Sequence, residues 1–141
     1  MTKVANRVSV VIDSSVAVCW FLPDEYSSLA NKALDLVEHG RMFAPILLRY
    51  ELQNVLLMNE RRGRIAPTQV ETGFRRFMAL PATYLFDFEP VFAAGIVRRH
   101  ALSAYDAAYI DVALRRGLPI ATLDKRLSQA AIAEGIEIIH P

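Results

Sequence analysis

The stretch VSVVIDSSV, residues 8–16, joins a short apolar run to a carboxylate and two serines. The run from Val8 to Ile12 is rich in β-branched residues, which predicts a buried strand. It ends on Asp13, and a negative charge at the end of a buried strand is costly unless a positive group meets it. The partner of Asp13 must therefore come from elsewhere in the chain or from a bound cation.

Length and composition limit the classes of protein to which this chain can belong. Its 141 residues predict a single domain over 1–141, and 53% hydrophobic residues suffice for a substantial core. A formal net charge of +1 gives no global argument for nucleic-acid binding. The single cysteine, Cys19, excludes an internal disulfide. No stretch approaches 18 uninterrupted apolar residues, so we expect a soluble cytoplasmic protein with no membrane partner.

Strand and helix patterns alternate along the rest of the chain. Short apolar or β-branched runs predict further strands at residues 42–45, 82–88, 118–123 and 136–140. Apolar spacing, caps and Pro or Gly breaks predict helices at residues 14–22, 24–39, 47–62, 67–80, 89–100, 104–116 and 125–135. This alternation predicts an α/β fold, with a mainly parallel central sheet in a three-layer α/β/α arrangement and a helical hairpin around residues 61–67.

Two acidic residues follow predicted strands. Asp13 ends the first strand, and Asp124 comes directly after the run 118–123. The carboxyl ends of parallel strands meet at one edge of a sheet, where function gathers. Each aspartate could instead be only the N-cap of the next helix. Capping explains either residue alone but does not require both to lie at one edge.

Glu51 lies within the apolar stripe of the predicted helix 47–62. It is four residues after Leu47 and four before Val55, so it shares their face. The alternative is a glutamate at the edge of the stripe that bends out to solvent. Acids without a partner are rarely buried. The position of Glu51 therefore predicts either a side chain that reaches solvent or a functional role.

The predicted helix after Ser103 carries two aspartates on different faces. Asp111 and Arg115 are four residues apart, which predicts an ordinary solvated ion pair. Asp106 lies on nearly the opposite side, with Tyr109. The alternative for Asp106 is a capping box with Ser103, although aspartate is shorter than the preferred glutamate.

Four acids are therefore candidates for one site: Asp13, Glu51, Asp106 and Asp124. If they converge, their negative charges repel strongly. Either some of the carboxylates then bind protons, or cations bind between them. Oxygen ligands with no histidine or cysteine nearby suit Mg²⁺ or Mn²⁺. A carboxylate cluster that holds such cations is the machinery of phosphodiester hydrolysis.

The ordered segments VIDSSV, RYEL, SAYDAAYIDVAL and ATLDKRL resemble those of the PIN-domain nucleases, and among them the VapC-type toxins of toxin–antitoxin modules. The resemblance runs from Val8 to about Ile139. It implies a PIN-like fold with a catalytic pocket formed by Asp13, Glu51, Asp106 and Asp124. Asp13 and Asp106 match the principal Mg²⁺-binding positions of the family.

The resemblance also extends to hydroxyl groups and partners. Thr122 matches a position that can orient a ligand or water, and Ser14 is a further candidate, although helix capping is its simpler explanation. The family implies a homodimeric endoribonuclease toxin that is inhibited by a cognate VapB-type antitoxin. Attack of water on phosphorus is expected to leave a 3′-hydroxyl and a 5′-phosphate. Two alternatives stay open: a PIN nuclease of RNA processing without an antitoxin, and a catalytically silent RNA- or protein-binding module.

Basic and apolar surfaces add less specific predictions. The segment RRGR at residues 61–64, together with Arg75 and Arg76, could contact RNA phosphates beside the acids. Arginine is also favourable at solvated helix ends, which is the competing explanation. The Leu- and Met-rich face of the hairpin 47–80 is either core or a groove for the antitoxin.

Overall fold

The computed structural model describes residues 7–141, so the first six residues of the predicted domain lie outside the described part. One sheet contains four strands: β1 (Ser9–Ile12), β2 (Arg41–Pro45), β3 (Ala82–Leu85) and β4 (Ile120–Ala121). The strand order is β3-β2-β1-β4, and every neighbouring pair is parallel. The predicted α/β class with a parallel central sheet is therefore confirmed.

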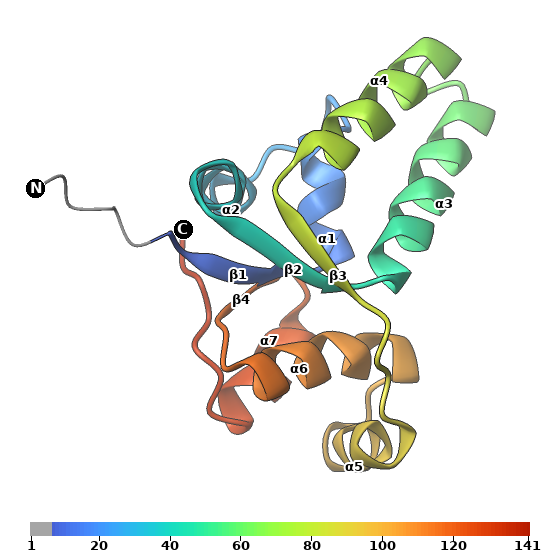
Figure 1. Ribbon diagram of the computed structural model, residues 1–141. Coiled ribbons are helices and arrows are strands. Elements are labelled where there is room, and N and C mark those ends of the chain that lie inside the picture. Colours follow the sequence, from blue (N-terminus) through green and yellow to red (C-terminus); the bar gives the residue numbers. More distant parts are fainter. Residues whose placement is uncertain (1–6) are drawn as a thin grey trace, which may run out of the picture.

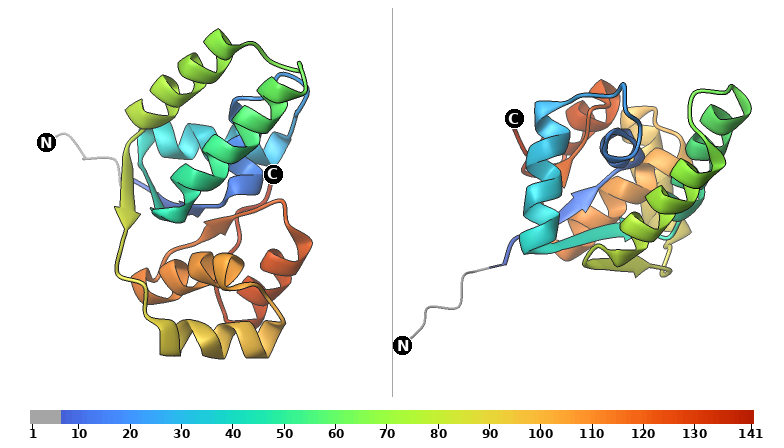
Figure 2. Two further views of the ribbon diagram at one scale, coloured as in Figure 1. Left: turned by 90° about the vertical axis from the view of Figure 1, so that its right-hand side faces the viewer. Right: turned by 90° about the horizontal axis from the view of Figure 1, so that it is seen from above.

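Helices cover both faces of this sheet. They are α1 (Ser14–Ala17) with the 3₁₀ turn η1 (Val18–Trp20), α2 (Ser28–His39), α3 (Leu47–Arg61), α4 (Pro67–Ala79), α5 (Pro90–His100), α6 (Ala104–Arg116) and α7 (Lys125–Ala133). In Figure 1, α1 to α4 lie on one side of the sheet and α5 to α7 on the other, which is the predicted three-layer arrangement. Figure 2 shows α3 and α4 side by side as the predicted hairpin.

The inner strand β1 leads directly to Asp13, the first of the four candidate acids. Val10, Val11 and Ile12 are fully buried, as expected for a β-branched run in a parallel sheet that is covered on both faces. β1 pairs with β2 on one side and with β4 on the other. Because all these strands are parallel, the residues that follow β1 and β4, Asp13 and Thr122, emerge at the same edge.

The second predicted helix begins later than expected. A helix was predicted at residues 24–39, but α2 starts at Ser28. Ser27 is the N-cap, because its hydroxyl accepts a hydrogen bond from the backbone N–H of Ala30 at 3.1 Å. A serine whose hydroxyl satisfies a free backbone donor thus determines where this helix begins.

One predicted strand is shorter than its apolar run, and the prediction of another is wrong. The run 82–88 forms ladder pairs only as far as Leu85, and the carbonyl of Asp87 accepts a hydrogen bond from Arg115 instead. The run 136–140 forms no strand; it contributes a single parallel bridge between Ile138 and Ile120. β4 itself has only two residues, so this edge of the sheet offers little backbone for a further strand.

The hairpin packs most of its apolar face into the core. Leu48, Leu52 and Leu56 of α3 are buried, as are Val70 and Phe77 of α4. Of the two explanations offered for this face, core is therefore correct for these residues. Between residues 7 and 141, no helix has the length and hydropathy that a membrane-spanning segment requires.

Candidate active site

Asp13 is buried at the carboxyl end of β1, with 4% of its surface exposed. Its Oδ1 accepts hydrogen bonds from the Ser15 hydroxyl at 2.7 Å and from the backbone N–H of Val16 at 3.2 Å. Its Oδ2 accepts a hydrogen bond from the Thr122 hydroxyl at 2.5 Å. The bond from Val16 is the N-cap of α1, so capping accounts for one oxygen of Asp13. The bond from Thr122 comes from the residue that follows the neighbouring strand β4, and capping does not account for it.

The electrostatic state of Asp13 follows from this burial. Burial raises the pKa of Asp13 to about 6, although the hydrogen bonds from Thr122, Ser15 and Val16 act in the opposite direction. The negative charge of Asp124 raises this pKa further. No lysine or arginine in the described part of the chain contributes to it. A carboxylate in this state favours the binding of a proton or a cation.

Thr122 connects Asp13 to the second acid at this edge. Its hydroxyl donates to Asp13 and accepts a hydrogen bond from the backbone N–H of Asp124 at 3.0 Å. The Asp124 side chain is the N-cap of α7, with Oδ1 accepting from the N–H groups of Arg126 and Leu127 at 2.8 and 3.2 Å. Both capping bonds use the same oxygen, so the cap occupies only half of the Asp124 carboxylate.

Glu51 is half-buried in the second turn of α3 and points toward α6. Its Oε1 accepts a hydrogen bond from the Tyr109 hydroxyl at 2.5 Å. Burial raises the pKa of Glu51, and the charge of Asp106 adds to this rise. Hydrogen bonding by Tyr109 and, to a lesser extent, by Ser14 lowers the pKa. Glu51 is therefore held between two helices.

Asp106 is partly exposed in the first turn of α6. The Ser103 hydroxyl accepts a hydrogen bond from the backbone N–H of Asp106 at 3.1 Å, which is the N-cap of α6. Over residues 7–141 no hydrogen bond engages the Asp106 carboxylate, so the reciprocal half of a capping box is not formed. Its charge acts on Glu51, which places these two carboxylates near each other.

Tyr109 is a residue of this site that the sequence patterns did not identify. It is 1% exposed, and burial raises the pKa of its phenol, followed by the charges of Glu51, Asp13 and Asp106. Three of the four acids thus lie within electrostatic range of one phenol, which stays protonated and donates to Glu51. The available signal was the spacing of Tyr109, three residues after Asp106 on the same helix face.

Ser15 is a second residue that the sequence patterns passed over. Its hydroxyl donates to Asp13 and accepts a hydrogen bond from the backbone N–H of Leu123 at 2.9 Å. Ser15 therefore fastens the start of α1 to the segment after β4. Ser14, the serine that was singled out, acts on Glu51 instead.

Electrostatic interactions link the four acids in two pairs. Asp13 interacts electrostatically with Asp124, and Glu51 with Asp106. Across residues 7–141, no three Asp, Glu, His or Cys side chains lie close enough to make a metal site by themselves. The donor set still fits Mg²⁺, because this ion keeps several water ligands and needs only one or two carboxylates from the protein.

The ion pair of Asp111 and Arg115 forms as predicted, but it is not solvated. Asp111 is 2% exposed, and Arg115 donates to both of its oxygens at 2.7 Å. Arg115 also donates to the carboxylate of Asp87 at 2.8 Å and to its carbonyl at 2.9 Å. The prediction of a solvated pair was wrong because helical spacing does not show which segment packs over the pair.

Comparison with known proteins supports this description of the fold. The family model described as PIN domain matches residues 10–133. Among curated proteins, the chain is similar to "Ribonuclease VapC3" of Pyrobaculum aerophilum, with 28% identity over 127 residues, which cover 86% of this chain and 94% of that protein.

Solved structures share the fold at lower sequence identity. The crystal structure of PAE2754 from Pyrobaculum aerophilum has a TM-score of 0.70 at 22% identity and covers 95% of this chain and 91% of that one. FitAcB from Neisseria gonorrhoeae has a TM-score of 0.62 at 15% identity, covering 94% and 97%. VapC20 of Mycobacterium tuberculosis, described as a sarcin-ricin loop cleaving toxin, has a TM-score of 0.63 at 15% identity, covering 94% and 99%. Since the family model spans most of the chain, the chain belongs to the PIN-domain family.

Proposed function

We propose that this protein is a cytoplasmic endoribonuclease toxin that depends on Mg²⁺ or Mn²⁺. The observation that carries the proposal is Asp13, a buried carboxylate beside a second acid at the same sheet edge, with no basic side chain acting on it in the described chain. RNA as the substrate is supported by the relatives, one named a ribonuclease and one a sarcin-ricin loop cleaving toxin.

In this proposal Asp13 and Asp106 hold the cation, while Glu51 and Asp124 complete the acidic pocket. When bound, the cation supplies activation of water and stabilisation of charge at the phosphodiester. Thr122 and Ser15 fix the Asp13 carboxylate by donating to its two oxygens. No side-chain nucleophile is required, and the expected products carry a 3′-hydroxyl and a 5′-phosphate.

Tyr109 has a positioning role in the same proposal. Its hydroxyl holds one oxygen of Glu51 across the gap between α3 and α6. Since its pKa is raised, the phenol keeps its proton and remains a donor. Tyr109 therefore orients Glu51 by hydrogen bonding and does not act as an acid or base in the reaction.

Two protein partners belong to the proposal: a cognate VapB-type antitoxin and a second copy of the chain. A shallow cavity of about 260 Å³ between η1 and α4 is a candidate place for the antitoxin. Trp20 and Phe21 line one side of it, and Gly73 and Arg76 of α4 line the other. Aromatic walls beside an arginine suit a peptide that carries both apolar and acidic side chains.

Cleavage of structured cellular RNAs by the purified protein tests this function. We expect discrete cuts with Mg²⁺, none with EDTA, and recovery when Mg²⁺ is restored. Asp106→Asn removes one proposed ligand and should abolish cutting. Asp35→Asn is the matched control, because the side chain of Asp35 on α2 is 75% exposed and lies outside the proposed site.

Four outcomes would contradict all or part of the proposal. Cutting that persists in EDTA, or that is equal in Asp106→Asn and wild type, would exclude the metal-dependent site described here. A folded protein that cuts none of several RNAs with either Mg²⁺ or Mn²⁺ would favour a silent binding module. Metal-dependent cutting by a protein with no antitoxin encoded beside it would favour the RNA-processing alternative.

A further inference from the structure

Arg49, in the first turn of α3, is a half-buried arginine that lies against an aromatic ring. Its guanidinium carbon is 4.4 Å from the centre of the Tyr84 ring. The Nε of Arg49 is buried without a hydrogen-bond partner, and so is the hydroxyl of Tyr84. Among residues 7–141, no carboxylate forms an ion pair with Arg49. Buried polar atoms without a partner are rare in folded proteins, so this place is suited to a ligand.

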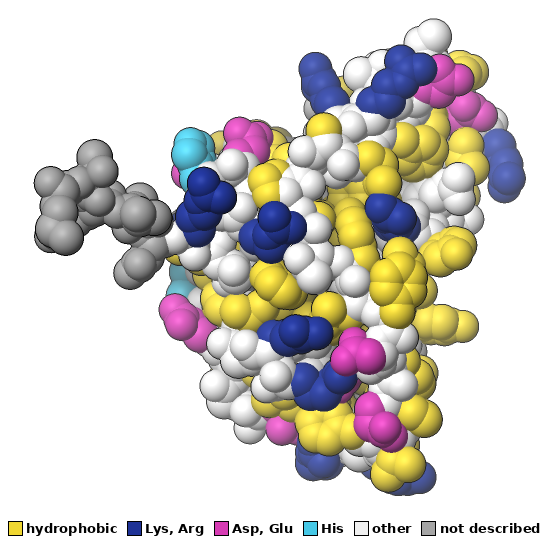
Figure 3. Space-filling view, in the orientation of Figure 1, with side chains coloured by type: hydrophobic (Ala, Val, Ile, Leu, Met, Phe, Trp, Pro, Cys, Tyr) yellow, Lys and Arg dark blue, Asp and Glu magenta, His cyan; other side chains and the backbone are white. Residues whose placement is uncertain are grey.

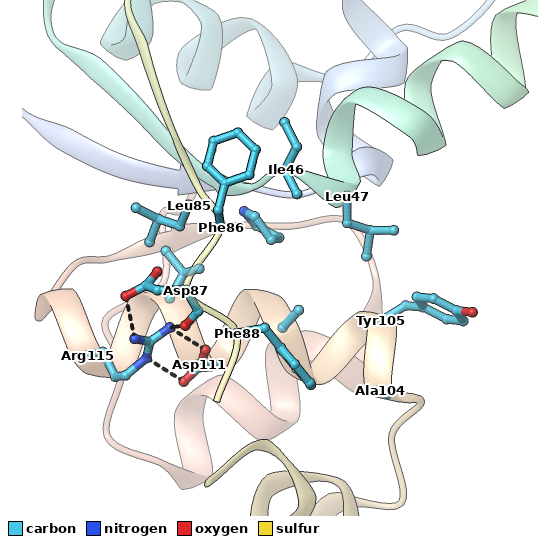
Figure 4. Close-up of a pocket in the computed structure, with 13 residues that line it drawn as sticks. Ile46, Leu47, Leu85, Phe86, Asp87, Phe88, Ala104, Tyr105, Asp111 and Arg115 are labelled. Carbon is cyan, nitrogen blue, oxygen red and sulfur yellow. Dashed lines mark hydrogen bonds and ion pairs between the residues drawn. The ribbon is translucent and has the colours of Figure 1, made fainter. Parts of the chain in front are cut away.

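Arg115 shows the contrasting case of an arginine that the fold has fully paired. Its guanidinium donates hydrogen bonds to both carboxylate oxygens of Asp111 and to the carboxylate and carbonyl of Asp87. Figure 4 shows these three side chains at the wall of a cavity of about 430 Å³. Arg49 has no such carboxylate in the described chain, so its charge is available for an anion that binds from outside.

Arg49 lines a separate cavity of about 290 Å³ between α3 and α4. It is the only charged residue of this lining within the described part of the chain. Tyr50, Gln53 and Met78 are the exposed members of the lining, and the rest are apolar: Ile46, Leu52, Phe74 and Phe77. In Figure 3, basic and hydrophobic side chains are interspersed on the face where β3 and α4 lie. A cavity of roughly 300 Å³ is at the lower limit of small-molecule sites, which suits a single planar ring system.

The cavity lies within one turn of α3 from the proposed acidic pocket. Successive helix residues project about 100° apart, so Arg49, Tyr50 and Glu51 spread across one half of the helix surface. Glu51 points toward α6, where it accepts the hydrogen bond from Tyr109, and Arg49 points toward β3. Tyr50 lies between them and is 67% exposed. A strand that leaves the acidic pocket over α3 therefore meets Tyr50 first and Arg49 next.

The polar and aromatic groups here match the parts of an unpaired nucleotide. The ring of Tyr50 can stack on a base, and the guanidinium of Arg49 can bind a phosphate. The amide of Gln53 offers both a donor and an acceptor to the edge of a base. Bases in a duplex are stacked on one another and cannot enter such a cavity, whereas bases of loops and single strands can. The chemistry therefore favours single-stranded RNA.

We propose that this cavity is a nucleotide subsite that holds one unpaired base of the RNA beside the cut. In this subsite the base stacks on Tyr50, and a neighbouring phosphate binds Arg49. The proposal rests on the nuclease function proposed above, because it names the form of RNA that reaches the acids. Arg49 and Tyr50 select the strand and take no part in bond cleavage. The cavity shares no lining residue with the one assigned to the antitoxin.

Fluorescence anisotropy with an end-labelled single-stranded RNA of about 12 nucleotides tests the subsite. Asp106→Asn serves as the parent protein, with Mg²⁺ present, so that the RNA is bound without being cut. We expect Arg49→Met to raise Kd about tenfold and to lower the slope of log Kd against log salt by about 0.7, the value for one phosphate contact on a single strand. Tyr50→Ser should raise Kd about tenfold without changing this slope, because stacking involves no charge.

Conservative variants and matched controls separate these effects from general damage. Tyr50→Phe keeps the ring and should bind like the parent, and Arg49→Lys keeps the charge and should keep the salt slope. Arg98→Met and Tyr26→Ser are the controls, because both residues are exposed and lie outside the cavity. A duplex of the same RNA sequence should show no loss with Tyr50→Ser. Circular dichroism checks that every variant keeps its helix content.

The subsite and the nuclease function fail in different ways. Equal Kd and equal salt slope in Arg49→Met and the parent would overturn the subsite and favour an acidic peptide as the occupant. A folded protein that binds no single-stranded RNA would also overturn it. Metal-dependent cutting by wild type together with unchanged binding in both variants rejects the subsite alone. The predicted losses of binding in a protein that cuts no RNA reject the nuclease function alone.

Discussion

Two aspartates of this chain are equally buried and have opposite surroundings. Asp13 is 4% exposed and Asp111 is 2% exposed. Asp111 receives two hydrogen bonds from a guanidinium, whereas Asp13 receives its bonds from two hydroxyls and one backbone N–H. The fold thus supplies a full counter-charge to Asp111 and none to Asp13.

This difference separates a structural carboxylate from one that we propose to be functional. Burying a charge costs free energy unless an opposite charge compensates it. Arg115 provides that compensation for Asp111 and joins α6 to the β3–α5 connection. Asp13 is held in place by neutral donors, and its pKa is raised to about 6. Its carboxylate has no basic partner, so it is free to bind a cation. The absence of a basic partner, rather than burial alone, therefore distinguishes the proposed site.

Replacing Asp13 should give the largest effect and should separate activity from stability. In Asp13→Asn we expect RNA cleavage to fall more than about 100-fold, because a proposed metal ligand is lost. The free energy of unfolding at pH 7 should rise by on the order of 3 kcal/mol, because the pKa of Asp13 is about 6 in the folded protein against an ordinary value of 3.8.

The sign of this stability effect depends on pH. A raised folded-state pKa destabilises the native protein above pH 6, and the penalty disappears as pH falls below about 4. The gain of Asp13→Asn should therefore vanish at low pH. Urea denaturation of both proteins at pH 7.5 and pH 3.5 measures it. Equal stabilities at pH 7.5 would show that burial of this charge is not costly.

Removing the Arg115 guanidinium beside Asp111 should lower the stability of the protein. In Arg115→Met the buried carboxylate loses its partner, and we expect the free energy of unfolding to fall by about 3 kcal/mol. Asp111→Asn and the double variant complete a cycle that isolates the coupling between the two side chains. A coupling below about 0.5 kcal/mol would contradict the structural role assigned to the pair. Because Arg115 is not part of the acidic site, RNA cleavage measured well below the unfolding transition should change little.

The substitution of Tyr109 should have the smallest effect on cleavage. Its uncharged phenol donates a hydrogen bond to Glu51. In Tyr109→Phe the hydrogen bond that lowers the pKa of Glu51 is lost, so this pKa should rise further. We expect kcat to fall about tenfold with little change in KM. This is the range for residues that hydrogen-bond to the ligands of a metal site. The acid limb of the pH–rate profile should also move to higher pH. A lower melting temperature with an unchanged pH profile would instead make Tyr109 a purely structural residue.

The strands of this fold were predictable where local pattern and burial agree. The run before Asp13 is β-branched and continuous, and its last three residues are fully buried in β1. The runs 82–88 and 136–140 have similar composition but form less strand, because ladder length depends on the neighbouring strand and on tertiary hydrogen bonds. Composition therefore predicted the four strands that form but not where they end, and it predicted a fifth at 136–140 that does not form.

The acids were predictable as exceptions to helix and strand patterns, and their supporting residues were not. Glu51 is half-buried, and Asp106 stands apart from the Asp111–Arg115 pair, as helix geometry indicates. Tyr109 and Ser15 look like ordinary core and cap residues in the sequence. The partner of Tyr109 is 58 residues away, and the Leu123 N–H that donates to Ser15 is 108 residues away. Their roles in the active site, like those of the four acids, remain predictions for the experiments above.

The hydrogen bond from Thr122 to Asp13 joins residues that are 109 positions apart. During synthesis on the ribosome, Asp13 emerges early, but β4 and Thr122 emerge only when most of the chain has been made. A partial chain therefore contains the first acid without the hydroxyl that fixes it or the strand that flanks it. An incomplete copy therefore cannot assemble this acidic edge, which forms only when synthesis of the chain is nearly finished.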